Sequence, residues 1–188
     1  MITVNEIKQV FPKLKKLSKF ERQIQFAALI TEYMKAKNIK PVIVGGLAVE
    51  IYTRNDYQTQ DIDFVSDGWD KFNSILTDLG FIRTEREWYH TDLEIAVEVP
   101  SNVLEGSEEH IVELELLDGK NVYVISVEDI IIHRLEGIVF STTYPKEDED
   151  DEWAHRLFLI HRDNLDLTYL KEQAEATKVL SFIKEWMK

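Results

Sequence analysis

Apolar residues near the start of the chain recur at the three- and four-residue spacing of amphipathic helices. In residues 1–17 this spacing is interrupted by Pro12, which favours one or two helical turns around the proline over a single unbroken helix. Ser18 then stands three residues before Glu21, which is the arrangement of a capping box. The apolar spacing that follows predicts a long helix ending near Lys37.

After this helix the pattern changes from helical spacing to short apolar runs. Residues 42–44 predict a buried strand, and the adjacent glycines Gly45 and Gly46 predict a turn into a helix over residues 47–54. Residues 55–60 are polar and predict a loop.

A second strand and a third helix follow the polar loop. Residues 61–66 predict a strand in which Ile62 and Phe64 face one side and Asp61, Asp63 and Val65 face the other. Residues 69–79 have helical spacing, and Gly80 stands where a helix C-cap is expected.

The rest of the chain predicts several strands and then helices. The expected strands are short apolar runs over residues 81–89, 93–99, 111–117 and 121–125, and the expected helices cover residues 126–139, 153–161 and 167–187. Pro100 closes the second of these strands, and Asp118-Gly119 predicts a hairpin between the last two. The acidic run over residues 146–152 predicts an exposed, mobile segment.

This order of elements predicts an α+β fold in which a mixed sheet is flanked by helices and followed by a helical C-terminal part. We expect residues 1–40 to pack as helices on a core formed by residues 41–125. Residues 126–188 form the helical part, and the three segments are expected to make one compact unit.

The composition excludes cysteine-dependent sites and argues against a membrane-spanning or secreted protein. The chain has 188 residues, 44% apolar content and no cysteine, so disulfides, thiolate zinc sites and thiol nucleophiles are excluded. No apolar run approaches the roughly 18 residues that span a bilayer, and the first residues lack the order of a secretory signal. We expect a cytoplasmic protein with no membrane partner.

Charge is divided unevenly along the chain. Residues 1–40 contain nine Lys or Arg and three Glu, a net of +6, whereas the remainder contains 13 and 32, a net of −19, within the total of −13. Phosphate repulsion from most of the surface argues against broad DNA binding. The basic residues of the first helices form either a local basic patch or a solvated helix surface.

Asp61 and Asp63 are the first candidates for chemistry. Carboxylates at i and i+2 on a strand point to the same side, roughly 6–7 Å apart at about 3.3 Å per residue. Magnesium prefers such oxygen ligands and leaves its other positions to water and phosphates. An exposed strand also carries this pattern for solubility, so the pair needs a second observation.

Gly45 and Gly46 supply that observation. A strand followed by two glycines and a helix leaves backbone N–H groups free of β-carbons at the helix N-terminus, where a phosphate can approach closely. A plain tight turn explains the glycines alone. It does not explain a carboxylate pair one helix later, which would repel an anion unless a cation lay between them.

Together, Gly45-Gly46, the helix and the run Thr59-Gln60-Asp61-Ile62-Asp63-Phe64 resemble the signature of the nucleotidyltransferase-fold superfamily. This superfamily includes DNA polymerase beta, aminoglycoside nucleotidyltransferases and small minimal nucleotidyltransferases of bacterial toxin–antitoxin systems. The resemblance is sharp over residues 41–66 and looser over residues 67–160.

The resemblance implies a third carboxylate on a later core strand. Glu98 is the candidate because it lies near the end of its predicted strand and precedes Pro100, and Glu94 on the same predicted face is the alternative. By the same resemblance, Asp61 and Asp63 hold two magnesium ions. Glu98 then ligates the metal that activates the acceptor hydroxyl, or acts as its base.

The resemblance also implies a nucleotide site. Gly45 and Gly46 would hold the triphosphate, with Thr59 beside them, and Arg54 would either contact phosphate or form a salt bridge with the acidic surface. The expected substrate is therefore a nucleoside triphosphate, and the expected cofactor is magnesium (two ions).

The implied activity is transfer of a nucleoside monophosphate from an NTP to an acceptor, which is a small molecule, a protein or a tRNA. The net negative charge favours a cationic acceptor over RNA. The alternative is a catalytically silent protein of the same fold that binds a nucleotide or a protein partner, as in toxin–antitoxin pairs. Arg156 and His161 also have the Arg-x4-His spacing of HEPN-type ribonucleases, which arises easily by chance.

Overall fold

A computed structural model describes residues 2–140 and 149–188. Contacts within the chain divide it into two compact units, Met1–Ile125 and Ser126–Lys188. No helix in the described ranges is both long enough and apolar enough to cross a membrane.

The first unit is built on a seven-stranded sheet with the order β3-β4-β5-β2-β1-β7-β6. The strands are β1 (Val42–Val44), β2 (Asp61–Val65), β3 (Ile82–Arg83), β4 (Glu87–His90), β5 (Ile95–Ser101), β6 (Val112–Glu115) and β7 (Asn121–Val124). β1 pairs antiparallel with β2 and parallel with β7, and β2 pairs parallel with β5. The sheet is therefore mixed, as the sequence predicted.

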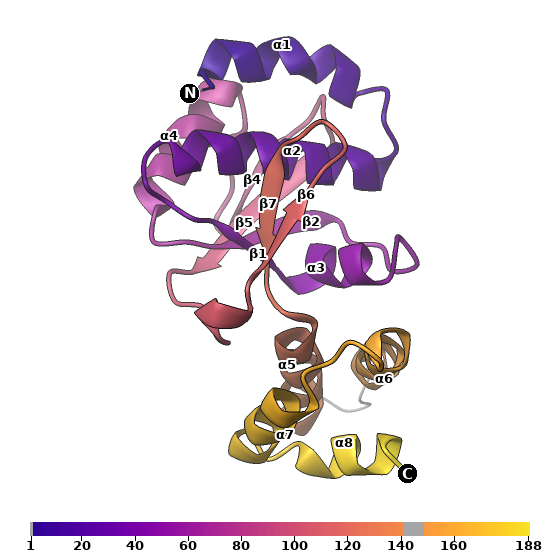
Figure 1. Cartoon of the computed structure of the whole chain (residues 1–188). Coiled ribbons are helices and arrows are strands. Elements are labelled where there is room, and N and C mark those ends of the chain that lie inside the picture. The colour runs from indigo at the N-terminus through magenta and orange to yellow at the C-terminus, as the bar shows by residue number, and fades with distance from the viewer. Residues whose placement is uncertain (1, 141–148) are drawn as a thin grey trace. The chain divides into compact units, whose positions relative to one another are not determined.

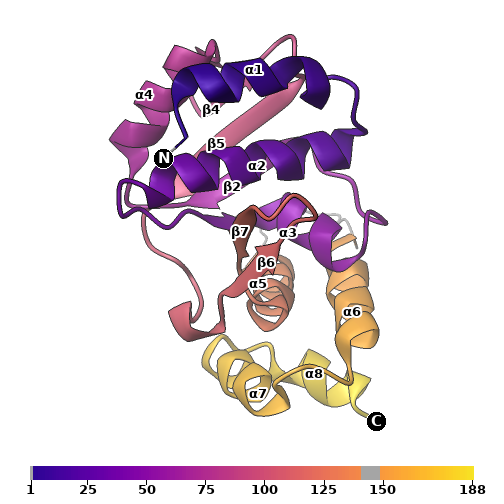
Figure 2. The same ribbon diagram turned by 45° about the horizontal axis from the view of Figure 1, so that its top comes forward.

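Four helices accompany this sheet: α1 (Val4–Leu14), α2 (Lys19–Lys35), α3 (Gly45–Tyr52) and α4 (Trp69–Leu79). Both views show α1, α2 and α4 on one side of the sheet (Figures 1 and 2). The central strands contribute fully buried side chains to the core, among them Ile43, Ile62, Phe64 and Val97. In β2, the apolar residues Ile62 and Phe64 are buried, whereas Asp61 and Asp63, which alternate with them, are partly exposed.

The start of α2 and the end of α4 confirm the sequence signals for these two helix termini. Ser18 and Glu21 form the predicted capping box at the start of α2, and Gly80 is the left-handed C-cap of α4 at φ +97°. The prediction for residues 1–17 was wrong, because α1 runs through Pro12 as one helix. Pro12 lies in the last turn, and a second capping box at Thr3 and Glu6 fixes the start of the helix.

Two strand predictions need correction. Residues 81–89 do not form one strand, because a turn in which Thr84 N donates to Glu87 O (2.8 Å) separates β3 from β4. β5 does not stop at Pro100 but continues to Ser101, whose carbonyl accepts the Ser66 N–H at 3.1 Å. The predicted hairpin is confirmed, with Gly119 at φ +79° in the turn between β6 and β7.

The second unit consists of helices. These are α5 (Val127–Phe140), α6 (Glu149–His161), α7 (Leu167–Ala176) and α8 (Leu180–Trp186). Trp186 stacks on His155 with 4.9 Å between ring centroids, which joins α8 to α6. The predicted helix over residues 167–187 is divided at Lys178, which has φ +66°. The acidic run was predicted to be mobile, but residues 149–152 begin α6, and residues 146–148 lie outside the described residues.

The predicted fold class is confirmed by this architecture: an α+β chain with a mixed sheet, flanking helices and a helical C-terminal part. The C-terminal end of β1 lies beside the first half of β2, which pairs with β5. The three candidate carboxylates Asp61, Asp63 and Glu98 lie on β2 and β5.

Candidate functional site

Gly45 lies directly against Asp63. β1 and β2 pair so that Val44 is opposite Asp63, and Gly45 follows as the first residue of α3. Gly45 has φ +61°, and a β-carbon there would collide with Oδ2 of Asp63. The position therefore requires glycine for two independent reasons, its backbone conformation and the closeness of the carboxylate.

Gly46 makes a similar close approach to Thr59. A β-carbon on Gly46 would lie 2.7 Å from Cβ of Thr59 and still closer to its hydroxyl oxygen. The same hydroxyl donates a hydrogen bond to Oδ1 of Asp61 at 2.8 Å. Thr59 is only 7% exposed, so its side chain is buried between the Gly-Gly turn and Asp61. The two glycines thus bring both aspartates of β2 close to the start of α3.

The N-terminus of α3 has no side-chain cap. Its N-cap is Val44, which cannot accept a hydrogen bond from the first-turn N–H groups. α3 also starts at Gly45 rather than at residue 47, so both glycines belong to its first turn. Uncapped N–H groups at a glycine-rich helix start form a favourable position for a phosphate.

Glu98 is brought beside the aspartates by the pairing of β2 with β5. The register sets Asp63 next to Glu98 and Asp61 next to Ala96. Partial burial raises the pKa of Glu98, the charges of Asp61 and Glu87 raise it further, and Arg86 acts in the opposite direction. Glu98 therefore lies in the electrostatic field of Asp61.

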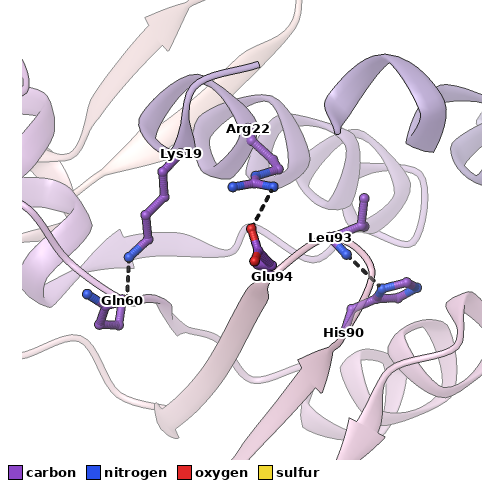
Figure 3. A network of polar contacts seen from close by, with 6 residues as sticks. All are labelled: Lys19, Arg22, Gln60, His90, Leu93 and Glu94. Carbon is purple, nitrogen blue, oxygen red and sulfur yellow. Dashed lines mark hydrogen bonds and ion pairs between the residues drawn. The ribbon is translucent and has the colours of Figure 1, made fainter. Parts of the chain in front are cut away.

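Glu94, the alternative third carboxylate, has a different environment. It precedes β5 in a left-handed conformation at φ +50°, and its side chain is 71% exposed. Its carboxylate accepts a hydrogen bond from Arg22 of α2 at 3.4 Å, as the close view shows (Figure 3).

Arg54 lies in the exposed turn after α3 at φ +56°. No hydrogen bond or ion pair joins it to Asp61 or Glu98 among the described residues. The Arg-x4-His pair lies on α6, where Arg156 forms an ion pair of 2.6 Å with Glu152 one turn earlier.

Two residues near the aspartates were not among the sequence candidates. Glu50 of α3 is 3% exposed, and its carboxylate accepts the backbone N–H of Thr59 at 3.1 Å. Lys19, the first residue of α2, donates a hydrogen bond to the side chain of Gln60 (Figure 3). A charged residue inside the apolar run LAVEIY was the available signal for Glu50, whereas Lys19 has no distinguishing local pattern.

The carboxylates of the site are neighbours in the sheet but do not form a closed cage. Across residues 2–140 and 149–188, no three histidine or acidic side chains are grouped so that they could hold a metal ion by themselves. The arrangement combines an uncapped helix start, two aspartates and a nearby glutamate. It can bind a phosphate on one side and a cation on the other.

Comparisons with known proteins agree with this fold. The model of the family described as "Nucleotidyltransferase of unknown function (DUF6036)" matches residues 18–188. A search of curated protein sequences finds no match.

Two solved structures are similar in fold. An antigenic nucleotidyltransferase-like protein from Paracoccidioides brasiliensis has 14% identity and a TM-score of 0.57, with 85% of this chain and 91% of that chain covered. The antibiotic-resistance factor ANT(2'')-Ia has 18% identity and a TM-score of 0.52, with 89% and 91% covered. These likenesses show a nucleotidyltransferase fold. Because the family model covers nearly all of the chain, the protein belongs to the family of nucleotidyltransferases of unknown function, DUF6036.

Proposed function

We propose that the protein is a magnesium-dependent nucleotidyltransferase that moves a nucleoside monophosphate from an NTP to an acceptor hydroxyl or amine. The observation that carries this proposal is the joint position of Gly45, Asp63 and Glu98. The glycine turn contacts one aspartate, and that aspartate is the register partner of the glutamate.

The triphosphate binds at the start of α3. Gly45 and Gly46 provide N–H groups without β-carbons, and the α3 dipole favours negative charge at this end. Arg54 is exposed at the other end of the same helix, so its contact with phosphate depends on movement of its long side chain.

The donor set suits magnesium. Magnesium usually takes one or two protein carboxylates and completes its coordination with water and phosphate, so it does not need a closed cage of three acids. Asp61 and Asp63 would hold two ions, with Glu98 as a third ligand. When bound, the ions supply charge neutralisation at the phosphates and lower the pKa of the acceptor group. Burial and the charges of Asp61 and Glu87 raise the pKa of Glu98, and a cation bound beside these acids would offset their repulsion.

In this proposal, Glu98 takes the acceptor proton. In the proposed reaction the acceptor oxygen or nitrogen forms a bond to the α-phosphorus, and the bond between that phosphorus and the α,β-bridging oxygen breaks. Pyrophosphate leaves, and a carboxylate oxygen of Glu98 receives the proton of the acceptor. In the metal-free protein, burial and the neighbouring acids raise the pKa of this carboxylate, so proton uptake by Glu98 relieves an unfavourable negative charge.

A shallow hollow beside Glu98 provides room for the acceptor. It has a volume of about 360 Å³ and is lined by Thr84, Glu85, Arg86, Glu87 and Glu98. Three carboxylates and one guanidinium leave this lining acidic, which favours an acceptor with positive charge over a polyanion such as tRNA.

The test is incubation of the purified protein with each α-labelled NTP, magnesium and a cell extract, followed by identification of the labelled fraction. Metal-dependent pyrophosphate release with label in one fraction supports the proposal. The double variant Asp61→Ala, Asp63→Ala is the control, and it must lose both NTP binding and turnover. Equal activity in this variant would rule the proposal out, and a complete lack of pyrophosphate from any NTP would favour a catalytically silent binding protein.

A further inference from the structure

Glu50 is a buried carboxylate in a helix that is otherwise apolar on its buried side. It is 3% exposed, and its neighbours Leu47, Ala48 and Val49 are completely buried. Burial raises the pKa of Glu50, while its hydrogen bond from Thr59 and the charge of Lys19 act in the opposite direction. Burying a carboxylate is costly unless it is paired or hydrogen-bonded, so the hydrogen-bond partners of Glu50 are informative.

The contacts of Glu50 lead directly to the proposed metal site. Its Oε2 accepts the backbone N–H of Thr59 at 3.1 Å. The hydroxyl of Thr59 in turn donates to Oδ1 of Asp61 at 2.8 Å. Glu50 is therefore linked to Asp61 through Thr59.

The loop between α3 and β2 is tied to α3 at two further points. The backbone carbonyl of Glu50 accepts the Asn55 N–H at 2.9 Å, and the hydroxyl of Thr53 accepts the Tyr57 N–H at 3.2 Å. Both of these contacts lie in the first half of the loop. In the second half, next to Asp61, the side chain of Glu50 binds the Thr59 N–H, and Lys19 of α2 donates to the side chain of Gln60.

Fixing Thr59 determines how Asp61 can be used. A threonine hydroxyl has one hydrogen to donate, and here that hydrogen goes to Oδ1 of Asp61. The bond limits rotation of the carboxylate and leaves Oδ2 as the oxygen available to a cation. Hydrogen bonds of this kind orient the carboxylates of metal sites and tune their affinity.

We propose that Glu50 is a positioning residue of the nucleotidyl-transfer site, which holds Thr59 so that Asp61 presents Oδ2 to the metal. This inference rests on the proposed function. It assigns to Glu50 a role in metal affinity, which is distinct from a general contribution to folding.

The test uses the full chain and four variants. Glu50→Leu removes the acceptor, Glu50→Gln keeps an amide oxygen that can accept the Thr59 N–H, and Thr59→Val removes only the hydroxyl. Glu172→Gln, at an exposed position of α7, is the control for loss of one negative charge. Three quantities are measured: the melting temperature, the exchange rate of the Thr59 amide proton, and the Mn²⁺ affinity by electron paramagnetic resonance. Mn²⁺ is titrated in a mixture of the four α,β-methylene NTP analogues.

We expect Glu50→Leu and Thr59→Val to weaken Mn²⁺ binding by about 10- to 100-fold, the usual effect of losing such an orienting contact. Glu50→Gln should stay within about threefold of the original protein. The Thr59 amide should exchange faster in Glu50→Leu but not in Thr59→Val, because the latter keeps the bond to Glu50. A purely structural role of Glu50 would give the same exchange rates but would leave the Mn²⁺ affinity of the folded Glu50→Leu variant unchanged.

Each result decides between the two proposals. If the original protein binds no Mn²⁺ with any NTP analogue, the proposed function fails and this inference fails with it. If the original protein binds Mn²⁺ and Glu50→Leu binds it equally well, only the role of Glu50 is overturned. Should Glu50→Leu not fold, Thr59→Val still decides the matter, since unchanged Mn²⁺ affinity in that variant removes the link from Glu50 to Asp61.

Discussion

Asp63 of β2 is the register partner of Glu98 of β5, so two acids lie side by side at the centre of a sheet. Like charges at neighbouring strand positions are destabilising. The burial of Glu98 and the charge of Asp61 both raise the Glu98 pKa, which shows the same unfavourable environment. Such an arrangement is expected where a cation or a reaction uses the acids.

We predict that Glu98→Gln lowers nucleotidyl transfer by at least about 100-fold, because it removes a charged ligand or base worth several kcal/mol in the transition state. The same change should leave the free energy of unfolding unchanged or raise it by about 0.2–1 kcal/mol, since it removes like-charge repulsion. Pyrophosphate release and urea unfolding measure the two quantities. Glu94→Gln is the matched control and should keep its activity, because Glu94 pairs with Arg22. If Glu94→Gln lost nucleotidyl transfer and Glu98→Gln kept it, Glu94 would be the third carboxylate.

We predict that Gly45→Ala is more harmful than Gly119→Ala, although both glycines have positive φ. Both substitutions introduce strain of about 1–2 kcal/mol in the left-handed region. Only Gly45 has a neighbour in the way, since its β-carbon would collide with Asp63, whereas Gly119 has nothing within 4 Å. Gly45→Ala should therefore lose NTP binding as well as stability, and Gly119→Ala should lose only stability. Isothermal titration with an NTP analogue and thermal melting test this, and equal NTP affinity in both variants would contradict it.

Local sequence signals were sufficient for much of the fold. The Ser18–Glu21 capping box and Gly80 as a C-cap are fixed by contacts within one or two turns, and both were predicted. The alternation in residues 61–66 placed Ile62 and Phe64 on one side of β2, and both are buried, but Val65, expected on the side of the aspartates, is buried as well. Glu98 became a candidate through its position before Pro100 together with the resemblance, and the pairing of β2 with β5 now places it beside Asp63.

Other features depend on contacts that are distant in sequence. Glu50 and Thr59 are nine residues apart and lie on different elements, so no local period indicates their hydrogen bond. The continuation of β5 through Pro100 depends on its partner Ser66, which lies beyond the reach of a local rule. Pro12 does not interrupt α1, contrary to the prediction from sequence. The buried side chains of Ile7 and Leu14, one in each half of the helix, stabilise α1 through contacts that a local rule does not include.

We predict that the stability of the first unit falls below neutral pH because of His90. Burial lowers the pKa of His90 from its ordinary value of 6.5; Asp92 opposes this and Lys15 reinforces it. The neutral ring accepts the Leu93 N–H at Nδ1 (3.2 Å, Figure 3) and packs against Phe11. The unfolded chain binds the His90 proton more readily than the folded protein does. The stabilisation by neutral His90 is therefore complete above the unfolded pKa, and it is lost as the pH falls below that pKa towards the lower pKa of the folded protein.

The measurement is urea unfolding between pH 7.5 and pH 5, as a general range around the histidine pKa of about 6.5. His90→Asn should flatten the decline, because the asparagine oxygen can replace Nδ1 as an acceptor and does not titrate. Asp92→Asn should instead lower stability about equally across this range, because Lys15 holds the Asp92 pKa below its ordinary value and the carboxylate stays charged there. The difference between this variant and the original protein should disappear only at lower pH, where Asp92 becomes protonated. An unchanged slope in His90→Asn would show that other groups cause the pH dependence.

We predict opposite stability effects for two buried threonines in the first unit. The hydroxyl of Thr31 is completely buried and has no hydrogen-bond partner among the described residues, whereas Thr53 donates to the Val49 carbonyl at 2.8 Å and accepts the Tyr57 N–H. Thr31→Val should raise the free energy of unfolding by about 1 kcal/mol, because a buried unsatisfied hydroxyl is replaced by a methyl group of similar size. Thr53→Val should lower it by about 1–2 kcal/mol, because it leaves the Tyr57 N–H without its acceptor. Chemical unfolding of the two variants under the same conditions tests both signs, and a loss of stability in Thr31→Val would indicate that its hydroxyl has a partner in solution.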